Sequence, residues 1–133
     1  MRPGPPRGDS TTLELTVTAK HAASPGDGVP PVLTARALVV AADATCRALF
    51  EPHLDVDEVA TLTRVDVGLR APVPVDATVT VAATVATVTS TGLVCEILAR
   101  HGGTIVARGS VEHRVVDRGT LTAEIAARQP VAG

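Results

Sequence analysis

One stretch of the chain has apolar residues at helical spacing, whereas most of the rest alternates between apolar and polar positions. Residues 34–51 read TARALVVAADATCRALFE, and their apolar positions form one wide face when wound into a helix. Thr34 has the side chain of a helix N-cap, and Pro52 cannot continue a helix. The pattern therefore predicts one long helix over residues 34–51.

Alternating apolar and polar residues predict five strands around this helix. The first surrounds Leu13, Leu15 and Val17, and the Pro- and Gly-rich residues 24–31 form a loop after it. The other four strands follow the helix and are rich in Val and Thr, over residues 59–70, 77–89, 93–100 and 104–116. Residues 119–129 are predicted to form a short final helix.

The order of the elements, β-α-β-β-β-β, indicates an α+β fold. One helix is too few to cover both faces of a parallel sheet, so we expect a curved antiparallel sheet wrapped around one long central helix. Such a sheet leaves an edge or a face open, and pairing with a second copy would cover it, so a homodimer is expected. Residues 1–10, rich in Pro and Gly, are predicted to be a disordered lead-in, and residues 11–130 form the domain.

Composition narrows the classes of function. The 133 residues carry a formal net charge of −2 and one aromatic residue, Phe50, which leaves neither a basic field nor a stacking platform for nucleic acid. No apolar run is long enough to cross a membrane and no signal peptide is visible, so a cytoplasmic protein is expected. Cys46 and Cys95 lie in apolar runs typical of buried thiols, and no spacing indicates a metal site.

Three short stretches carry a resemblance to a known family. Residues 29–35 (VPPVLTA) lead into the helix, residues 71–76 (APVPVD) precede a strand, and residues 109–113 (GSVEH) lie in the last strand. Their order and spacing resemble the hot-dog superfamily, and within it the fluoroacetyl-CoA thioesterase family, over about residues 12–118. The resemblance implies a hot-dog fold, a dimer, an acyl-thioester substrate such as a coenzyme A thioester, no cofactor, and a setting in specialised metabolism.

The resemblance also implies roles for residues on the helix. The family has a Thr near the start of this segment and a Glu on the helix, which serve as nucleophile or water-orienting groups. Here the Glu position falls on Asp43, which is shorter by one methylene. The Thr position falls on Ala35, with Thr34 beside it.

The family's His, at the end of the second strand, has no counterpart here. Its position falls on Leu69, or on Gly68 or Arg70 if the register shifts. In the last strand the family has a basic residue after the Glu, and here His113 follows Glu112. The scaffold is thus retained while the catalytic set is depleted.

Asp43 is also the most informative residue when it is considered without the resemblance. A carboxylate in an Ala- and Val-rich helix is costly to bury unless it is paired. Asp43 could be a general base that activates water, or it could form an ion pair with Arg47 one turn on. Thr34 could orient substrate or act as a nucleophile, or it could simply cap the helix. The free N–H groups from Thr34 to Arg36 could polarise a thioester oxygen.

The remaining candidates are for substrate binding. His113, which alternates with Val111 and Val115, could position an acyl or pantetheine group, or it could be a satisfied surface or interface residue. Arginines suit the phosphates of coenzyme A, and three lie near strand ends: Arg70, Arg100 and Arg108. With Ala35, Arg36, Leu69 and Arg70, His113 completes the predicted substrate-binding set.

We therefore expect an acyl-thioester hydrolase or a related acyl-thioester enzyme. Its acyl group would enter a tunnel beside the helix at the dimer interface, with Asp43 lining the cavity. Two alternatives stay open. One is a non-catalytic protein that binds an acyl group or another small hydrophobic ligand, which Leu69 favours by making the site drier. The other is a dehydratase or cyclase that uses Asp43 as acid and base.

Overall fold

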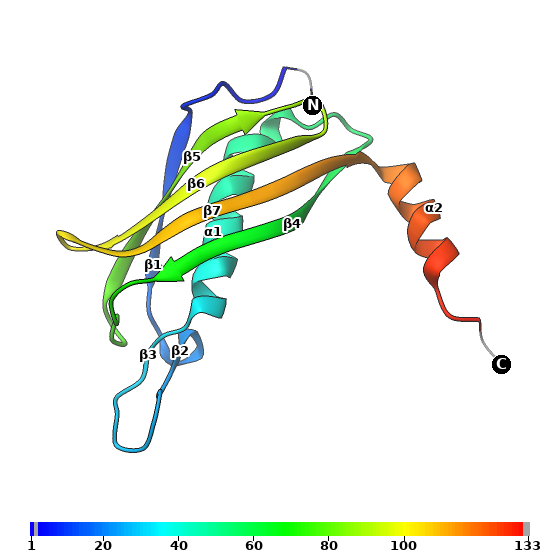
Figure 1. Cartoon of the computed structure of the whole chain (residues 1–133). Coiled ribbons are helices and arrows are strands. Elements are labelled where there is room, and N and C mark those ends of the chain that lie inside the picture. The colour runs from blue at the N-terminus through cyan, green and yellow to red at the C-terminus, as the bar shows by residue number, and fades with distance from the viewer. Residues whose placement is uncertain (2, 132–133) are drawn as a thin grey trace.

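The computed structural model describes residue 1 and residues 3–131, and it shows one antiparallel sheet curved around one helix (Figure 1). Its five strands lie in the order β1-β5-β6-β7-β4, so β1 and β4 are the two edges. The main elements are β1 (Ser10–Thr16), α1 (Ala35–Phe50), β4 (Glu58–Leu69), β5 (Thr78–Val88), β6 (Gly92–His101), β7 (Thr104–Asp117) and α2 (Arg118–Arg128). Short segments are η1 (Ala19–His21), β2 (Ala22–Ala23), β3 (Val32–Leu33) and η2 (Glu51–His53).

Helix α1 forms where the sequence predicted it. The Thr34 hydroxyl accepts a hydrogen bond from the Ala37 N–H at 3.2 Å, which satisfies one of the free donors at the helix start. One face is buried against the sheet and includes Leu38, Ala42 and Phe50. The small side chains of Ala41 and Ala42 let the sheet approach the helix closely.

The long strands alternate between a buried and an outward face, as predicted. In β5 the buried positions Val79, Val81 and Ala83 face α1, while Thr80 and Ala82 between them point outward. Register shifts interrupt the pairing of β4 with β7 and of β5 with β6, and such irregularities bend a strand and increase its twist. The sheet therefore curls around the helix instead of lying flat.

Gly109 permits a close approach between β7 and β4. A Cβ atom built there would lie 1.9 Å from the Asp66 carbonyl oxygen, which is far inside contact distance. No such restriction applies to Gly68 on the facing strand, where an added Cβ meets nothing within 4 Å. The contact fixes how β4 lies on β7.

Two parts of the chain contain structure that the sequence did not predict. Residues 1–10 were expected to be disordered, but Gly8 donates a backbone hydrogen bond to Val85, Asp9 accepts one from it, and Ser10 already belongs to β1. The loop over residues 24–31 is flanked by a small ribbon, in which β2 pairs with β3. In both places the order comes from backbone hydrogen bonds to a neighbouring segment. Strands of two residues are also too short to show an alternating pattern in the sequence.

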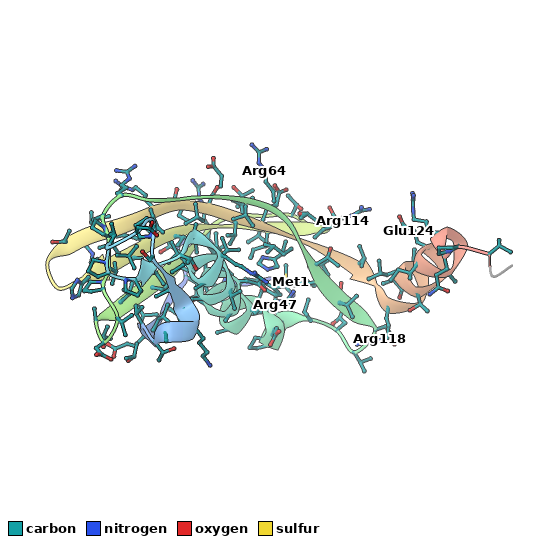
Figure 2. All side chains as sticks on the ribbon, turned by 90° about the horizontal axis from the view of Figure 1, so that it is seen from below. Met1, Arg47, Arg64, Arg114, Arg118 and Glu124 are labelled. Atoms are coloured by element: carbon teal, nitrogen blue, oxygen red, sulfur yellow. The ribbon has the colours of Figure 1, made fainter. Side chains whose placement is uncertain are left out.

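The final helix, α2, lies apart from the rest. Asp117 caps it by accepting a hydrogen bond from the Thr120 N–H at 2.9 Å, and none of its residues is buried. Figure 2 shows it extending away from the sheet, with Arg118 and Glu124 on its surface. None of the helices among the described residues is long and apolar enough to span a membrane.

Candidate active site

Asp43 lies in the middle of α1 and faces the β4–β7 side of the sheet. Its Oδ1 atom is 2.5 Å from Nε2 of His113 in β7 and 3.2 Å from Nε of Arg47. Its Oδ2 atom has a longer contact, 3.4 Å, with the same Arg47 nitrogen. The side chain of Asp43 is 27% exposed. One carboxylate oxygen is therefore held tightly and the other is the freer one.

His113 is enclosed on all sides. It is 0% exposed, and its ring packs on Phe50 with centroids 4.8 Å apart and planes tilted by 57°. Burial lowers the pKa of His113 more than the adjacent Asp43 raises it, and the positive charge of Arg47 lowers it further. The neutral imidazole then donates its Nε2 proton to Asp43, because a carboxylate can only accept. Nδ1 is left buried with no hydrogen-bond partner among the described residues.

Arg47 ties this carboxylate to the edge strand. Its Nη2 atom donates to the Ala60 carbonyl of β4 at 3.1 Å, and Nη1 lies 3.6 Å from the Glu51 carboxylate. The guanidinium carbon is 5.9 Å from the centre of the Phe50 ring, within the range of a cation–π contact. The ion pair of Asp43 with Arg47 therefore forms, and the Asp43 side chain is also set between α1 and β7. Figure 2 shows Arg47 on the helix side of the sheet, opposite Arg64 and Arg114.

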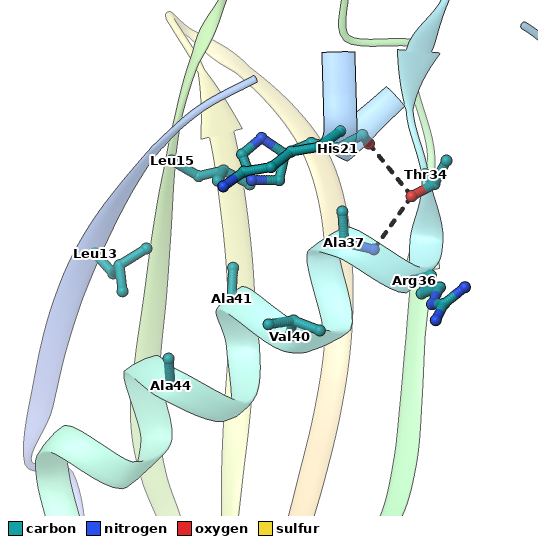
Figure 3. Close-up of a pocket in the computed structure, with 10 residues that line it drawn as sticks. Leu13, Leu15, His21, Thr34, Arg36, Ala37, Val40, Ala41 and Ala44 are labelled. Carbon is teal, nitrogen blue, oxygen red and sulfur yellow. Dashed lines mark hydrogen bonds between the residues drawn. The ribbon is translucent and has the colours of Figure 1, made fainter. Parts of the chain in front are cut away.

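At the start of α1, Thr34 is occupied by structural hydrogen bonds. Its hydroxyl accepts from the Ala37 N–H and donates to the His21 carbonyl at 3.3 Å (Figure 3). Ala35 and Arg36, the next two residues, are exposed, and their N–H groups precede the first intrahelical hydrogen bonds. The helix start therefore offers backbone donors, while the Thr34 side chain serves as the cap.

A pocket of about 550 Å³ opens beside the helix start, between α1 and β1 (Figure 3). We call it the β1 groove. Ten residues line it: Leu13, Leu15, Lys20, His21, Thr34, Arg36, Ala37, Val40, Ala41 and Ala44. Asp43 is not among them, so the cavity that the sequence placed at the acid is not this one.

The other predicted substrate-binding residues lie at the far end of β4. Leu69 is its last residue and is half-buried, and the backbone N–H of Arg70 donates to Val106 at 2.7 Å. A backbone hydrogen bond of 2.8 Å from Leu33 to Val73 brings the following turn beside the helix start. Among the hydrogen bonds and ion pairs of the described residues, none joins Asp43 to Leu69 or Arg70.

His113 is where the sequence interpretation fell short. It was taken as a substrate-binding group or a satisfied surface or interface residue, whereas it is buried beneath Asp43. Its alternation with Val111 and Val115, both buried, was the signal for an inward-facing position. Glu112 is less buried than its two neighbours, as expected for a residue on the other face of the strand.

Cys46 offers no nucleophile. Cys46 of α1 and Cys95 of β6 are both buried, as expected. A hydrogen bond with Cys95, followed by burial, raises the pKa of the Cys46 thiol far above its usual value, so Cys46 stays protonated. In the described part of the chain, His, Cys, Asp and Glu form no group of three that could hold a metal ion.

Solved structures define the class of protein. The fluoroacetyl-CoA thioesterase FlK matches with a TM-score of 0.85 and 23% identity, over 96% of this chain and 99% of that one. A hot-dog-like protein from Thermanaerovibrio acidaminovorans gives 0.87 and 20%, over 96% and 95%. A hypothetical protein from Thermus thermophilus, described as a thioesterase superfamily member, gives 0.86 and 20%, over 96% and 94%. The chain has the hot-dog fold, which confirms the predicted fold class.

The sequence then gives the family. Residues 17–119 match the model of the fluoroacetyl-CoA-specific thioesterase family, and the chain belongs to that family. No curated protein matches the chain. The resemblance predicted from the three short stretches is confirmed, and family membership supports acyl-thioester hydrolysis over the two alternatives left open by the sequence.

Proposed function

We propose that the chain hydrolyses a coenzyme A thioester, with Asp43 as the general base. The observation that carries this proposal is the asymmetric hydrogen bonding of the carboxylate. Oδ1 accepts the short hydrogen bond from His113 and lies within ion-pair distance of Arg47, which fixes the side chain. Oδ2 accepts only the long hydrogen bond from Arg47, at 3.4 Å, and can accept a proton.

In the proposed reaction a water molecule attacks the thioester carbonyl carbon and gives a proton to Oδ2 of Asp43. The carbon–sulfur bond then breaks, and the thiolate leaves with that proton as a thiol. His113 and Arg47 keep the carboxylate in one orientation throughout. Because Asp43 already carries out the proton transfer, this route does not need the His that Leu69 replaces.

The carbonyl oxygen needs donors where negative charge develops, and the N–H groups of Ala35 and Arg36 are suitable. They lie eight and seven residues before Asp43, which is about 10–12 Å along a helix with a 1.5 Å rise per residue. One carbonyl cannot contact both groups of the same copy at that separation. We therefore propose that the site is shared, with the helix start of one copy meeting Asp43 of another.

The edge strand β4 supports such a homodimer. It spans 12 residues and pairs with no described strand besides β7, which leaves its outer backbone groups open to a second copy. Its Val65 is 39% exposed near the middle of the strand, where an antiparallel pairing would bring two copies together. Arg70, just beyond β4, together with Arg100 and Arg108, is proposed to meet the phosphates of coenzyme A.

The dimer is tested with two matched valine substitutions. Val65→Asp places a charge at the proposed interface, whereas Val56→Asp places it in the turn before β4, where the valine is 87% exposed. Sedimentation should show that Val65→Asp dissociates the dimer and that Val56→Asp does not. A wild-type chain that sediments as a monomer at micromolar concentration would contradict the shared site.

Hydrolysis is tested by following thiol release from a panel of acyl-coenzyme A thioesters. Asp43→Asn should lower turnover by about 10²- to 10⁴-fold, the contribution typical of a general base. Glu51→Gln is the control, because Glu51 also pairs with Arg47 but lies on the exposed end of α1. If the wild type binds the thioesters and releases no thiol, the non-catalytic binding protein is the correct reading. The expected cytoplasmic location and role in specialised metabolism belong to the same proposal and require cell fractionation and gene disruption.

A further inference from the structure

The β1 groove lies on the flank of α1 opposite Asp43. Asp43 and Arg47 contact β7 and β4, whereas the groove is lined by Leu13 and Leu15 of β1. Because β1 and β4 are opposite edges of the sheet, the groove lies at the edge away from the one proposed to pair with a second copy. It is thus separate from Asp43, although its polar end borders the helix start whose N–H groups are proposed to hold the thioester oxygen.

The groove has an apolar length and a polar end. Leu13 and Leu15 form one wall, and the small and β-branched residues Ala37, Val40 and Ala44 form the other. From Ala37 to Ala44 the helix wall is about 10 Å long, at 1.5 Å per residue. The polar end has Lys20, His21 and Arg36, and no carboxylate is among the ten lining residues. This arrangement suits a ligand with an apolar tail and an anionic head.

His21 supplies a fixed donor at the polar end. Its Nδ1 accepts the Thr18 backbone N–H at 3.0 Å and is also 3.0 Å from the Thr18 hydroxyl. A neutral imidazole that accepts at Nδ1 carries its proton on Nε2. The His21 carbonyl is held in turn by the Thr34 backbone N–H and hydroxyl. Figure 3 shows the ring turned across the groove toward Leu15, so the Nε2 proton is presented to a bound ligand.

We propose that the β1 groove binds a free carboxylic acid with an unbranched apolar tail. The tail lies between β1 and α1, along Leu13, Leu15 and Ala44. The carboxylate accepts the His21 Nε2 proton, beside the positive charges of Lys20 and Arg36. The volume of about 550 Å³ is within the range of small-molecule sites. This site does not depend on hydrolysis at Asp43.

The first test is calorimetric titration of the full chain with sodium octanoate. Each methylene removed from the tail should weaken binding by about two- to fourfold, because each buried methylene contributes up to about 0.8 kcal/mol. Octanol, which has the tail without the carboxylate, should bind about tenfold more weakly. Equal affinity for octanol and octanoate would overturn the proposal, since the polar end would then be irrelevant.

Two substitutions of neighbouring exposed alanines locate the site. Ala44→Phe fills the groove and should weaken octanoate binding by at least about tenfold, whereas Ala48→Phe, one turn further along α1 and outside the lining, should not change it. Lys20→Gln should weaken binding by about two- to fivefold, as expected for an exposed charge. Far-ultraviolet circular dichroism confirms that each variant is folded. Unchanged binding in Ala44→Phe would contradict the proposal.

Asp43→Asn distinguishes this site from the proposed active site. Octanoate affinity should be unchanged in that variant even where thiol release is lost. Loss of octanoate binding in Asp43→Asn would overturn the separate site and leave the proposed hydrolase intact. If Ala44→Phe instead changes the sedimentation of the chain, the groove is an interface between copies, and the carboxylic acid site is wrong.

Discussion

On the β7 side of α1, polar groups are close together and largely shielded from solvent, whereas on the β1 side the same helix borders an open apolar groove. Asp43, His113 and Arg47 occupy the first flank and are joined by short contacts. Leu13, Leu15 and Val40 occupy the second, and Val40 is 67% exposed. One helix thus holds a carboxylate with polar partners on one flank and borders a ligand-sized volume on the other.

This difference has a physical reason, because an oriented carboxylate and an open pocket place opposite demands on the side chains around them. A carboxylate can be kept ionised and oriented on a mostly apolar helix only if partners surround it, and those partners fill the space that a substrate would need. An open volume is possible only where small side chains leave it unfilled. In a single copy, Asp43 and the open pocket therefore lie on different flanks of α1. We infer that a second copy completes the proposed active site.

The largest expected effect on stability comes from the close contact between β7 and β4 at Gly109. Gly109→Ala places a Cβ atom 1.9 Å from a backbone oxygen of β4, so the two strands must separate. We expect a loss of about 3 kcal/mol or more in the free energy of unfolding, at the upper end of overpacking effects. Gly68→Ala, on the facing strand with open space around it, is the control and should change stability by less than about 1 kcal/mol. Similar urea midpoints for the two variants would show that the contact is not rigid.

Two substitutions of His113 separate packing from chemistry. His113→Ala leaves a cavity beside Phe50 and should cost about 2–4 kcal/mol, whereas His113→Leu retains most of the volume and removes the unpaired Nδ1, so it should cost less than about 1.5 kcal/mol. Both remove the donor to Asp43, and we expect both to lower turnover by about tenfold. Full turnover in the stable His113→Leu variant would show that His113 does not position the carboxylate.

His113 should also make stability depend on pH. Burial lowers its pKa in the folded chain, so the unfolded chain binds more protons once the pH falls below the ordinary histidine value of about 6.5. Its contribution is therefore present above pH 6.5 and is lost as the pH falls, with a slope of at most about 1.4 kcal/mol per pH unit for one proton. Urea unfolding between pH 5 and pH 7 should show a flatter profile for His113→Leu. Identical slopes would assign the dependence to other groups.

The smallest expected effect concerns the helix start that borders the groove. Thr34→Ala removes the cap of α1 and should cost about 1 kcal/mol, measured from urea midpoints. Thr122→Ala in the exposed helix α2 removes a hydroxyl bonded to its own helix and should cost less than about 0.5 kcal/mol. If Thr34→Ala costs no more than this control, backbone contacts alone hold the helix start.

The fold could be predicted because its signal is local. Alternation within β5 and helical spacing within α1 each lie inside a short window of sequence, and the observed bounds agree with the expected ones within a residue or two. The partnership of Asp43 with His113 joins residues 70 positions apart. Sequence patterns state which face each residue occupies but not which residue lies opposite, so this pair could not be predicted.

The groove was missed for a related reason. Lys20 and His21 follow the first strand and belong to no apolar pattern, so the sequence gives no sign of where their side chains lie. Both enter the groove because η1 folds back beside the start of α1, through the hydrogen bonds of Thr34 to the His21 carbonyl. Such a return of the chain depends on single hydrogen bonds, which leave no periodic trace.

Helix α2 is attached to the domain by little more than its cap at Asp117, and it buries no side chain. Changes in its length or composition therefore cost the remainder almost nothing in free energy. Stability therefore places few constraints on the sequence of this segment, which can change or acquire a separate role. The same independence makes it a suitable position for attaching a fluorophore or an affinity tag.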